Sequence, residues 1–234
     1  MTRRRWIADE VSGNHAALAG AHADHLIRVL RVQAGQEFDI ATGSEVRRGR
    51  VTVVTGDRVE FQLAEIVPTA ASANITLLLA IFKFDRMEWA IEKSTELGVA
   101  KIIPVIARRT ESHLASAAAK RVERWQRIAR QASEQSRRIS PPEIASPVKL
   151  QDALGLRAIS RIVLAETEHE MMLKDVLPPD GDVALAFGPE GGWTEAELES
   201  FRKAGWKLAS LGSTILRAET AAIAATAVAV SHLQ

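Results

Sequence analysis

The sequence predicts an α/β protein in two parts, a small β-barrel or sandwich followed by a larger domain with a parallel sheet covered by helices on both faces. Strand-like runs divided by turn residues fill the first 70 residues, whereas short apolar runs alternate with helical patterns from residue 74 onward. The stretch 67–74 lacks large apolar residues after Val67. We therefore expect two domains, 1–70 and 74–234.

The first domain is expected to be built mainly from strands. Residues 37–41, 46–54 and 58–66 are strand-like, and Gly-containing turns separate them. A short helix is predicted over 23–30, with Leu26 and Leu30 one turn apart on its buried face. Strand alternation places Arg48 and Arg50 on one face, where they either face solvent or contact a polyanion.

The second domain is expected to alternate strands and helices. Residues 75–82 form the first strand, Asp85 caps a helix that ends at Gly98, and 102–106 form the next strand, which makes a βαβ unit. Further strands are predicted at 161–165, 183–187 and 207–211, and helices at 118–137, 194–204 and 218–233. Thr194 and Glu197 have the spacing of a capping box at the start of one of these helices.

Basic residues are concentrated in the middle of the chain. Residues 73–150 hold 14 basic and 8 acidic side chains, although the whole chain has a net charge of only +1. In the predicted helix 118–137, an apolar stripe that includes Trp125 and Ala129 packs inward and leaves a basic face outside. Such a bias suits a polyanion-binding surface, and it also occurs on ordinary solvated helices.

Composition excludes several classes of function. The chain of 234 residues is 47% hydrophobic and 25% charged, which is typical of globular proteins, and it has no cysteine for disulfides, thiolate catalysis or metal binding. The six histidines are scattered apart from His22 and His25, so we expect no metal. The start lacks a secretory pattern and the Ala-rich run 220–230 is too short to span a bilayer, so we expect a cytoplasmic protein without membrane contact.

Two Gly-containing passages near the C-terminus form the candidate site. The run 183–194 ends an apolar strand with Gly-Pro-Glu-Gly-Gly, and 211–220 reads Leu-Gly-Ser-Thr-Ile-Leu-Arg-Ala-Glu-Thr. Ligands of open α/β sheets bind beyond the carboxyl ends of the strands, so the two loops could share one ligand. Glu190, Arg217 and Glu219 would supply its charged groups. Taken alone, the first loop is also compatible with a simple tight turn.

Five separated motifs resemble one family, the 16S ribosomal RNA uridine N3-methyltransferases of the SPOUT superfamily, which use S-adenosylmethionine. They are 25–31 (HLIRVLR), 85–99 (DRMEWAIEKSTELGV), 134–138 (EQSRR), 187–192 (FGPEGG) and 211–220 (LGSTILRAET). They occur in the family's order over nearly the whole chain. Two positions depart from the family's pattern: Phe84 replaces a common glycine, and Thr214 replaces a common arginine.

The resemblance implies a PUA-like β-barrel that binds RNA over 1–70. It implies a SPOUT methyltransferase domain over 74–234 that binds the cofactor, contains a deep trefoil knot and forms a homodimer, with the active site at or near the subunit interface. The expected substrate is 16S rRNA, in the assembled small ribosomal subunit. The last helix would be the threaded one.

The same resemblance assigns roles to individual residues. Arg217 would stabilise the uracil anion or orient the base, and Glu219, or else Glu190, would remove the N3 proton; alternatively, Glu219 caps the last helix and Arg217 only pairs with it. The residues expected to hold the cofactor are Phe187, Gly188, Gly191, Gly192, Leu211, Gly212, Ile215 and Leu216. The candidates for contacts with RNA phosphates are Arg28, Arg31, Arg48, Arg50, Arg124, Arg137 and Arg138. The family-like motifs support Arg31 and Arg138, and the others are equally compatible with an ordinary solvated surface.

Two other functions remain open on the sequence. The same fold and cofactor could serve a methyltransferase that acts on another RNA base or on a ribose 2′-hydroxyl, because the fold does not determine the acceptor. A catalytically inactive RNA-binding ribosome assembly factor is also compatible, and the departure at Thr214 favours it slightly. Nucleotide hydrolysis is disfavoured because no P-loop pattern occurs.

Overall fold

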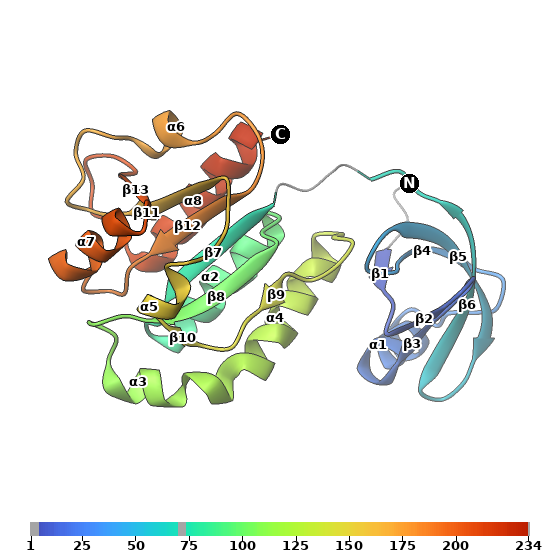
Figure 1. Ribbon diagram of the computed structural model, residues 1–234. Coiled ribbons are helices and arrows are strands. Elements are labelled where there is room, and N and C mark those ends of the chain that lie inside the picture. The colour runs from blue at the N-terminus through green and yellow to red at the C-terminus, as the bar shows by residue number, and fades with distance from the viewer. Residues whose placement is uncertain (1–4, 70–73, 234) are drawn as a thin grey trace. The chain divides into compact units, whose positions relative to one another are not determined.

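The computed structural model describes residues 5–69 and 74–233, and within them the chain forms two compact units (Figure 1). The first unit comprises Met1–Ala71 together with Ser133–Ser140, and the second comprises Ser72–Ala132 and Pro141–Gln234. The predicted boundary at 67–74 falls largely on residues 70–73, which lie outside the described residues.

A mixed six-stranded sheet forms the first unit, in the order β1-β4-β5-β6-β3-β2, and it curls into a barrel-like shape (Figure 1). β1 runs parallel to β4, and the other neighbours are antiparallel. The three predicted strands are confirmed with the predicted bounds. The strands β1 and β2 were not predicted because three residues are too few to show alternation, and β3 was not because its sequence, HAALA, does not alternate. The strands are β1 (Arg5–Ile7), β2 (Glu10–Ser12), β3 (His15–Ala19), β4 (Glu37–Ala41), β5 (Val46–Val54) and β6 (Arg58–Ile66).

One helical segment closes the core of this unit. Helix α1 (Gly20–Asp24) continues into a π-helical turn, His25–Val29, so the predicted helix at 23–30 is confirmed but begins earlier. Leu26 from this segment is fully buried with Phe61 of β6. Gly49 faces the same core, and a Cβ there would lie only 2.4 Å from Cγ1 of Ile40, so the strand requires glycine at this position.

The segment Ser133–Ser140 belongs to the first unit, although it includes the last turn of helix α4 (Val122–Gln135), which otherwise belongs to the second. Ile139 packs against a cluster that includes Ile7 and Val46, and His22 Nε2 lies 3.3 Å from a carboxylate oxygen of Glu134. A single boundary at 67–74 did not anticipate this segment, because an apolar residue directly after a helix gives no indication of which core receives it.

A parallel sheet forms the centre of the second unit, as predicted, in the order β10-β8-β7-β12-β11-β13 with β9 paired to β8 (Figure 1). Its strands are rich in apolar residues; β12, for example, is buried along its whole length. The strands are β7 (Ile75–Ala80), β8 (Lys101–Ile106), β9 (Glu143–Ile144), β10 (Val148–Lys149), β11 (Ser160–Leu164), β12 (Val183–Phe187) and β13 (Lys207–Ala209).

Helices cover both faces of this sheet. Leu77 and Leu79 of β7 belong to one buried cluster with residues of α2, α4 and α8, whereas Leu78 belongs to a second cluster with residues of α5 and α7. The two-sided α/β layering predicted from the sequence is therefore confirmed. The helices are α2 (Phe84–Glu96), α3 (Ser112–Ala117), α4 (Val122–Gln135), α5 (Leu150–Ala153), α6 (Leu173–Val176), α7 (Glu195–Lys203) and α8 (Ala218–Leu233).

The predicted helix ends agree with the structure at some positions and differ at others. The capping box of Thr194 and Glu197 is confirmed, but Asp85 is not a cap: Lys83 precedes α2 and Asp85 lies in its first turn. The predicted helix 118–137 is split, since Ala118–Arg121 is a 3₁₀ turn before α4. Its apolar stripe is confirmed by the burial of Trp125.

Among the helices of the described residues, none has the length and apolar character needed to span a bilayer.

Candidate functional site

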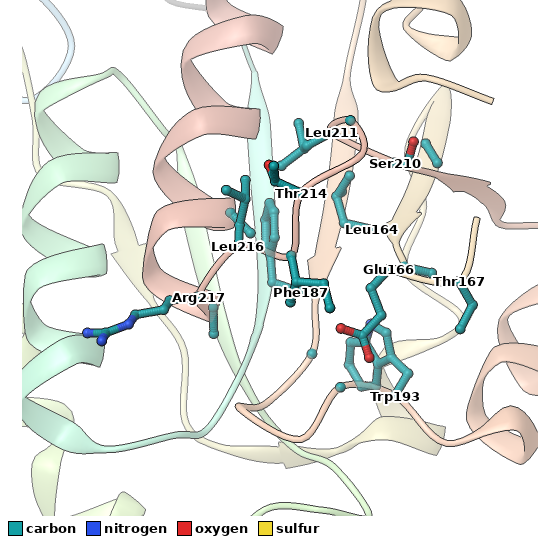
Figure 2. Close-up of a pocket in the computed structure, with 18 of the residues that line it drawn as sticks. Leu164, Glu166, Thr167, Phe187, Trp193, Ser210, Leu211, Thr214, Leu216 and Arg217 are labelled. Carbon is teal, nitrogen blue, oxygen red and sulfur yellow. The ribbon is translucent and has the colours of Figure 1, made fainter. Parts of the chain in front are cut away.

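A cavity of about 550 Å³ opens beyond the carboxyl ends of β11, β12 and β13 (Figure 2). Three chain segments form its wall, and each directly follows one of these strands: 164–169, 187–193 and 209–218. Arg86 of α2 completes the wall. Since the carboxyl ends of neighbouring parallel strands lie at one edge of a sheet, the topology itself gathers these loops.

The loop between β12 and α7 brings its main chain close to the cavity. Gly192 has a φ of +68°, which favours glycine, and its amide donates to the carbonyl of Pro189 at 2.8 Å. A Cβ on Gly188 would lie 3.2 Å from the backbone nitrogen of Trp193, and one on Gly192 would lie 3.1 Å from a carboxylate oxygen of Glu166. Side chains at these glycines would strain the loop or narrow the cavity.

A neighbouring loop supports this turn from outside. The guanidinium of Arg109, which follows β8, donates to the carbonyls of Gly191 and Trp193. Glu197 accepts from the backbone amides of Arg108 at 2.7 Å and of Thr194 at 2.8 Å. Gly191, predicted to contact a cofactor, therefore turns its carbonyl toward Arg109 and is not part of the cavity wall.

The third wall segment follows β13 and is more open. Gly212 has a φ of +132°, and residues 212–215 are exposed. Its base is fixed, because the amide of Ser210 donates to the carbonyl of Met171 at 2.8 Å. Phe187, Leu211 and Leu216 all line the cavity and give its wall apolar side chains (Figure 2).

Charged groups lie at one end of the wall. The Nη1 atom of Arg86 donates to Glu190 at 2.8 Å, and its Nε atom lies 3.8 Å from Glu219. Glu190 and Arg217 both line the cavity, whereas Glu219 is 2% exposed and is not part of the wall. In Figure 2 the side chain of Arg217 extends away from Phe187.

The loop after β11 was missed by the sequence analysis. Glu166, Thr167 and His169 of this loop line the cavity, and Glu166 points in the direction of Trp193 (Figure 2). Between them, Glu168 accepts the backbone amides of Glu170 and Met171, and these bonds lower the pKa of its carboxyl group. The other two loops were predicted from glycines after an apolar strand, and this loop has none; the polar residues directly after the predicted strand 161–165 are the signal that could have found it.

The predicted RNA-contacting arginines of the first unit differ in their surroundings. Arg31 and Arg50 are exposed, and Arg31 has a φ of +49°. Arg28 is also exposed but pairs with Asp24 at 2.7 Å. Arg48 pairs with Asp39 at 3.1 Å and with a second carboxylate at 3.5 Å, so much of its charge is already balanced.

The predicted arginines around α4 differ in the same way. Arg124 makes two hydrogen bonds to the carboxylate of Glu88, at 2.6 and 2.8 Å. Arg137 is exposed. Burial lowers the pKa of Arg138 to about 10, which leaves it charged at neutral pH, and its Nε donates to the carbonyl of Ser140.

Within 5–69 and 74–233, no cluster of three or more His, Asp or Glu side chains is arranged to hold a metal ion.

Comparisons with known proteins agree with this architecture. Residues 69–230 match the family model described as an RNA methyltransferase domain. The chain is 33% identical to ribosomal RNA small subunit methyltransferase E of Rickettsia conorii over 90% of this chain and 87% of that one. The protein of the same name from Bacillus subtilis is 31% identical over 88% and 85%.

Solved structures agree over almost the whole length. A ribosomal RNA small subunit methyltransferase E from Neisseria gonorrhoeae, bound to S-adenosyl methionine, superposes with a TM-score of 0.85 at 33% identity and covers 96% of this chain and 95% of that one. A Legionella pneumophila structure in complex with the cofactor SAM also has a TM-score of 0.85, at 30% identity and 99% and 98% coverage. The chain therefore belongs to the family of proteins with the RNA methyltransferase domain.

Proposed function

We propose that this protein transfers a methyl group from S-adenosylmethionine to N3 of a uridine in the 16S rRNA of the small ribosomal subunit. The observation that carries the proposal is the three-loop cavity at the strand ends, in a fold that superposes on relatives bound to this cofactor. The names of the sequence relatives support ribosomal RNA of the small subunit as the substrate. The resemblance in the motifs supports uridine N3 as the acceptor.

The cavity suits the shape and chemistry of this cofactor. Gly188 and Gly192 leave space that a Cβ would fill, so main-chain groups can approach an adenosine closely. The buried indole Nε1 of Trp193 has no hydrogen-bond partner among the described residues. The residues that would hold the cofactor are Phe187, Gly188, Gly192, Leu211, Gly212, Ile215 and Leu216. Gly191 would contribute indirectly, because its carbonyl accepts the hydrogen bond from Arg109 that supports the loop. When bound, S-adenosylmethionine supplies an electrophilic methyl group.

Glu190, Arg217 and Glu219 are assigned different roles in the reaction. Methylation of N3 requires loss of the imide proton and stabilisation of the charge left on the ring. Glu190 lies on the wall and can accept that proton, and Arg217 can reach a base that docks at the mouth of the cavity. Glu219 is buried behind the wall, so we assign it to positioning and not to proton transfer.

We further propose that the barrel over 1–70 is a PUA-like RNA-binding domain. Arg31, Arg50 and Arg137 are exposed, and they are the best placed of the predicted contacts to meet phosphates. Arg48 and Arg124 are engaged with carboxylates and would have to exchange these partners for phosphate. The assembled small subunit is the expected partner, because it presents rRNA in a fixed shape.

The topology supports two further parts of the proposal, the trefoil knot and the homodimer. β13 (Lys207–Ala209) lies at the edge of the sheet, and α8, the next helix, packs on α2, β7 and β12, so the chain after β13 returns across the sheet, as the proposed knot would require. Ile215 on the cavity wall is 82% exposed, which a second subunit would cover. Light scattering should give twice the chain mass, and an experimental chain trace should stay knotted when its ends are pulled.

Mass mapping of methylated nucleosides tests the proposed reaction. Purified protein, labelled S-adenosylmethionine and undermethylated small subunits should yield labelled N3-methyluridine at one position of 16S rRNA. Label on another base or on a ribose 2′-oxygen would replace the acceptor with one of the rival enzyme activities. Cofactor and subunit binding without any transfer would favour an assembly factor.

A further inference from the structure

Arg86 joins the two parts of the cavity wall that carry acidic side chains. It lies in the first turn of α2, where its Nη1 donates to Glu190 of the β12–α7 loop at 2.8 Å. Its Nε faces Glu219 in the first turn of α8 at 3.8 Å. One guanidinium thus connects α2, the glycine loop and the start of the last helix.

Glu219 makes this connection energetically important. Its carboxylate is 2% exposed, and its Oε2 atom has no hydrogen-bond partner among the described residues. A buried charge that loses its partner is strongly destabilising. Arg86, which is about one third exposed, stabilises this buried carboxylate and at the same time reaches the cavity wall.

We propose that Arg86 is a positioning residue for methyl transfer, which holds Glu190 at the cavity wall and fixes the glycine loop to the start of α8 through Glu219. The inference rests on the proposed function and extends it to a side chain that acts on the reaction through Glu190 and Glu219. The guanidinium serves two acceptors with two different nitrogens, and a lysine ammonium cannot reproduce this geometry.

Stability measurements on the free protein test the pairing with Glu219. Arg86→Gln should lower Tm by about 3–6 °C, because Glu219 is left buried without its cation. The double variant Arg86→Gln/Glu219→Gln should recover most of this loss. The matched control is Lys93→Gln, on the same helix, because Lys93 also bridges two carboxylates, Glu92 at 2.7 Å and Glu96 at 2.8 Å, but at the surface. It should leave Tm nearly unchanged.

Binding and kinetics test the positioning role separately. In the stability-restored double variant, kcat should still be roughly 10-fold or more below wild type, with KM for the subunit within about 3-fold, since the positioned carboxylate acts on the reaction and not on docking. Adding Glu190→Gln to Arg86→Gln should lower kcat no further than Arg86→Gln alone, because residues that act as one unit are not additive. Arg86→Lys should recover Tm but only part of kcat.

Three results would overturn the inference while leaving the proposed function intact: wild-type kcat in the stability-restored variant, additive losses for Arg86 and Glu190, or a change confined to KM for the subunit. The first would make Arg86 purely structural, the second would show that Arg86 acts independently of Glu190, and the third would make Arg86 a direct RNA contact. Wild-type protein that neither binds S-adenosylmethionine nor transfers a methyl group would instead remove the proposed function and this inference with it.

Discussion

At the scale of single residues, the glycines of the β12–α7 loop and the arginine that hydrogen-bonds to this loop determine the shape of the site. Gly188 and Gly192 allow the main chain to approach the cavity, and Arg109 fixes the turn between them from the opposite side. The sequence predicted most of the wall in these loops because glycine after an apolar strand is a local signal. It did not predict Arg86 as a wall residue, because α2 reaches the wall only through its packing against α8.

Removing the support of Arg109 should loosen the loop. Arg109→Ala loses the bonds to the carbonyls of Gly191 and Trp193, and we expect affinity for S-adenosylmethionine to fall roughly 5-fold, the equivalent of about one hydrogen bond. Arg108→Ala is the matched control, because Arg108 contacts Glu197 through its backbone amide. Calorimetric titration measures both. Equal affinities for the two variants would show that Arg109 does not support the site.

Arg217 should matter for chemistry more than for cofactor binding. Its side chain extends away from Phe187, so Arg217→Ala should change cofactor affinity little but lower kcat about 100-fold if it stabilises the uracil anion. Single-turnover methyl transfer with saturating subunits measures this effect. Unchanged turnover would exclude Arg217 from the mechanism.

At the scale of secondary-structure elements, length decided what the sequence could predict. In the second unit the strands β7, β8, β11, β12 and β13 were found as apolar runs, and the helices α2, α7 and α8 from their pattern and end signals. The elements α5, α6, β9 and β10 were missed, because two to four residues show no period. The 3₁₀ turn before α4 was missed because Ala118–Arg121 has helical composition and only the packing distinguishes its geometry.

The capping box of α7 should contribute measurably to stability. Thr194→Ala removes the side-chain acceptor for the amide of Glu197, and we expect a loss of about 1 kcal/mol. Ser200→Ala on the same helix is the control, because its hydroxyl only donates to the helical carbonyl of Ala196. Urea unfolding followed by tryptophan fluorescence gives both values. A loss no larger than that of the control would contradict the capping role.

The loop after β11 should respond to acid through Glu168. Because two amides donate to the folded carboxylate and lower its pKa, its stabilising effect is complete above the unfolded pKa, near 4.3, and is lost as pH falls through the lower folded value. The amide resonances of Glu170 and Met171 should therefore titrate with a midpoint below the ordinary value of about 4.3. Glu168→Gln should abolish this transition. A midpoint at or above the ordinary value would contradict the hydrogen bonds.

At the scale of the whole chain, the region rich in basic residues and the loops of the cavity come mostly from different parts of the sequence. Basic residues are concentrated in 73–150, whereas the cavity lies beyond strands β11 to β13. The pattern of strand-like and helical segments predicted an α/β domain after a β domain, but it could not reveal that residues 133–140 join the first unit, because that depends on contacts distant in sequence. The predictions of the cofactor and of the knot came from the family resemblance and not from periodicity.

RNA affinity should fall as salt rises, because phosphate contacts release counterions. Replacing the exposed Arg31 or Arg50 by Gln should weaken subunit binding and reduce the salt slope by about 1 for each. Arg202→Gln is the control, because Arg202 pairs with Glu195 at 2.7 Å on α7 and has no expected RNA contact. Binding curves at several salt concentrations measure the slopes, and a flat response in the wild type would contradict the RNA surface.

Calorimetric titration with S-adenosylmethionine shows whether the glycine-loop cavity holds the methyl donor. The wild-type protein should bind the cofactor saturably. Folded Gly188→Ala protein should bind at least about 10-fold more weakly, because its Cβ would press on the backbone of Gly192 and Trp193. Absence of binding by the wild type, or undiminished binding by the variant, would contradict the account.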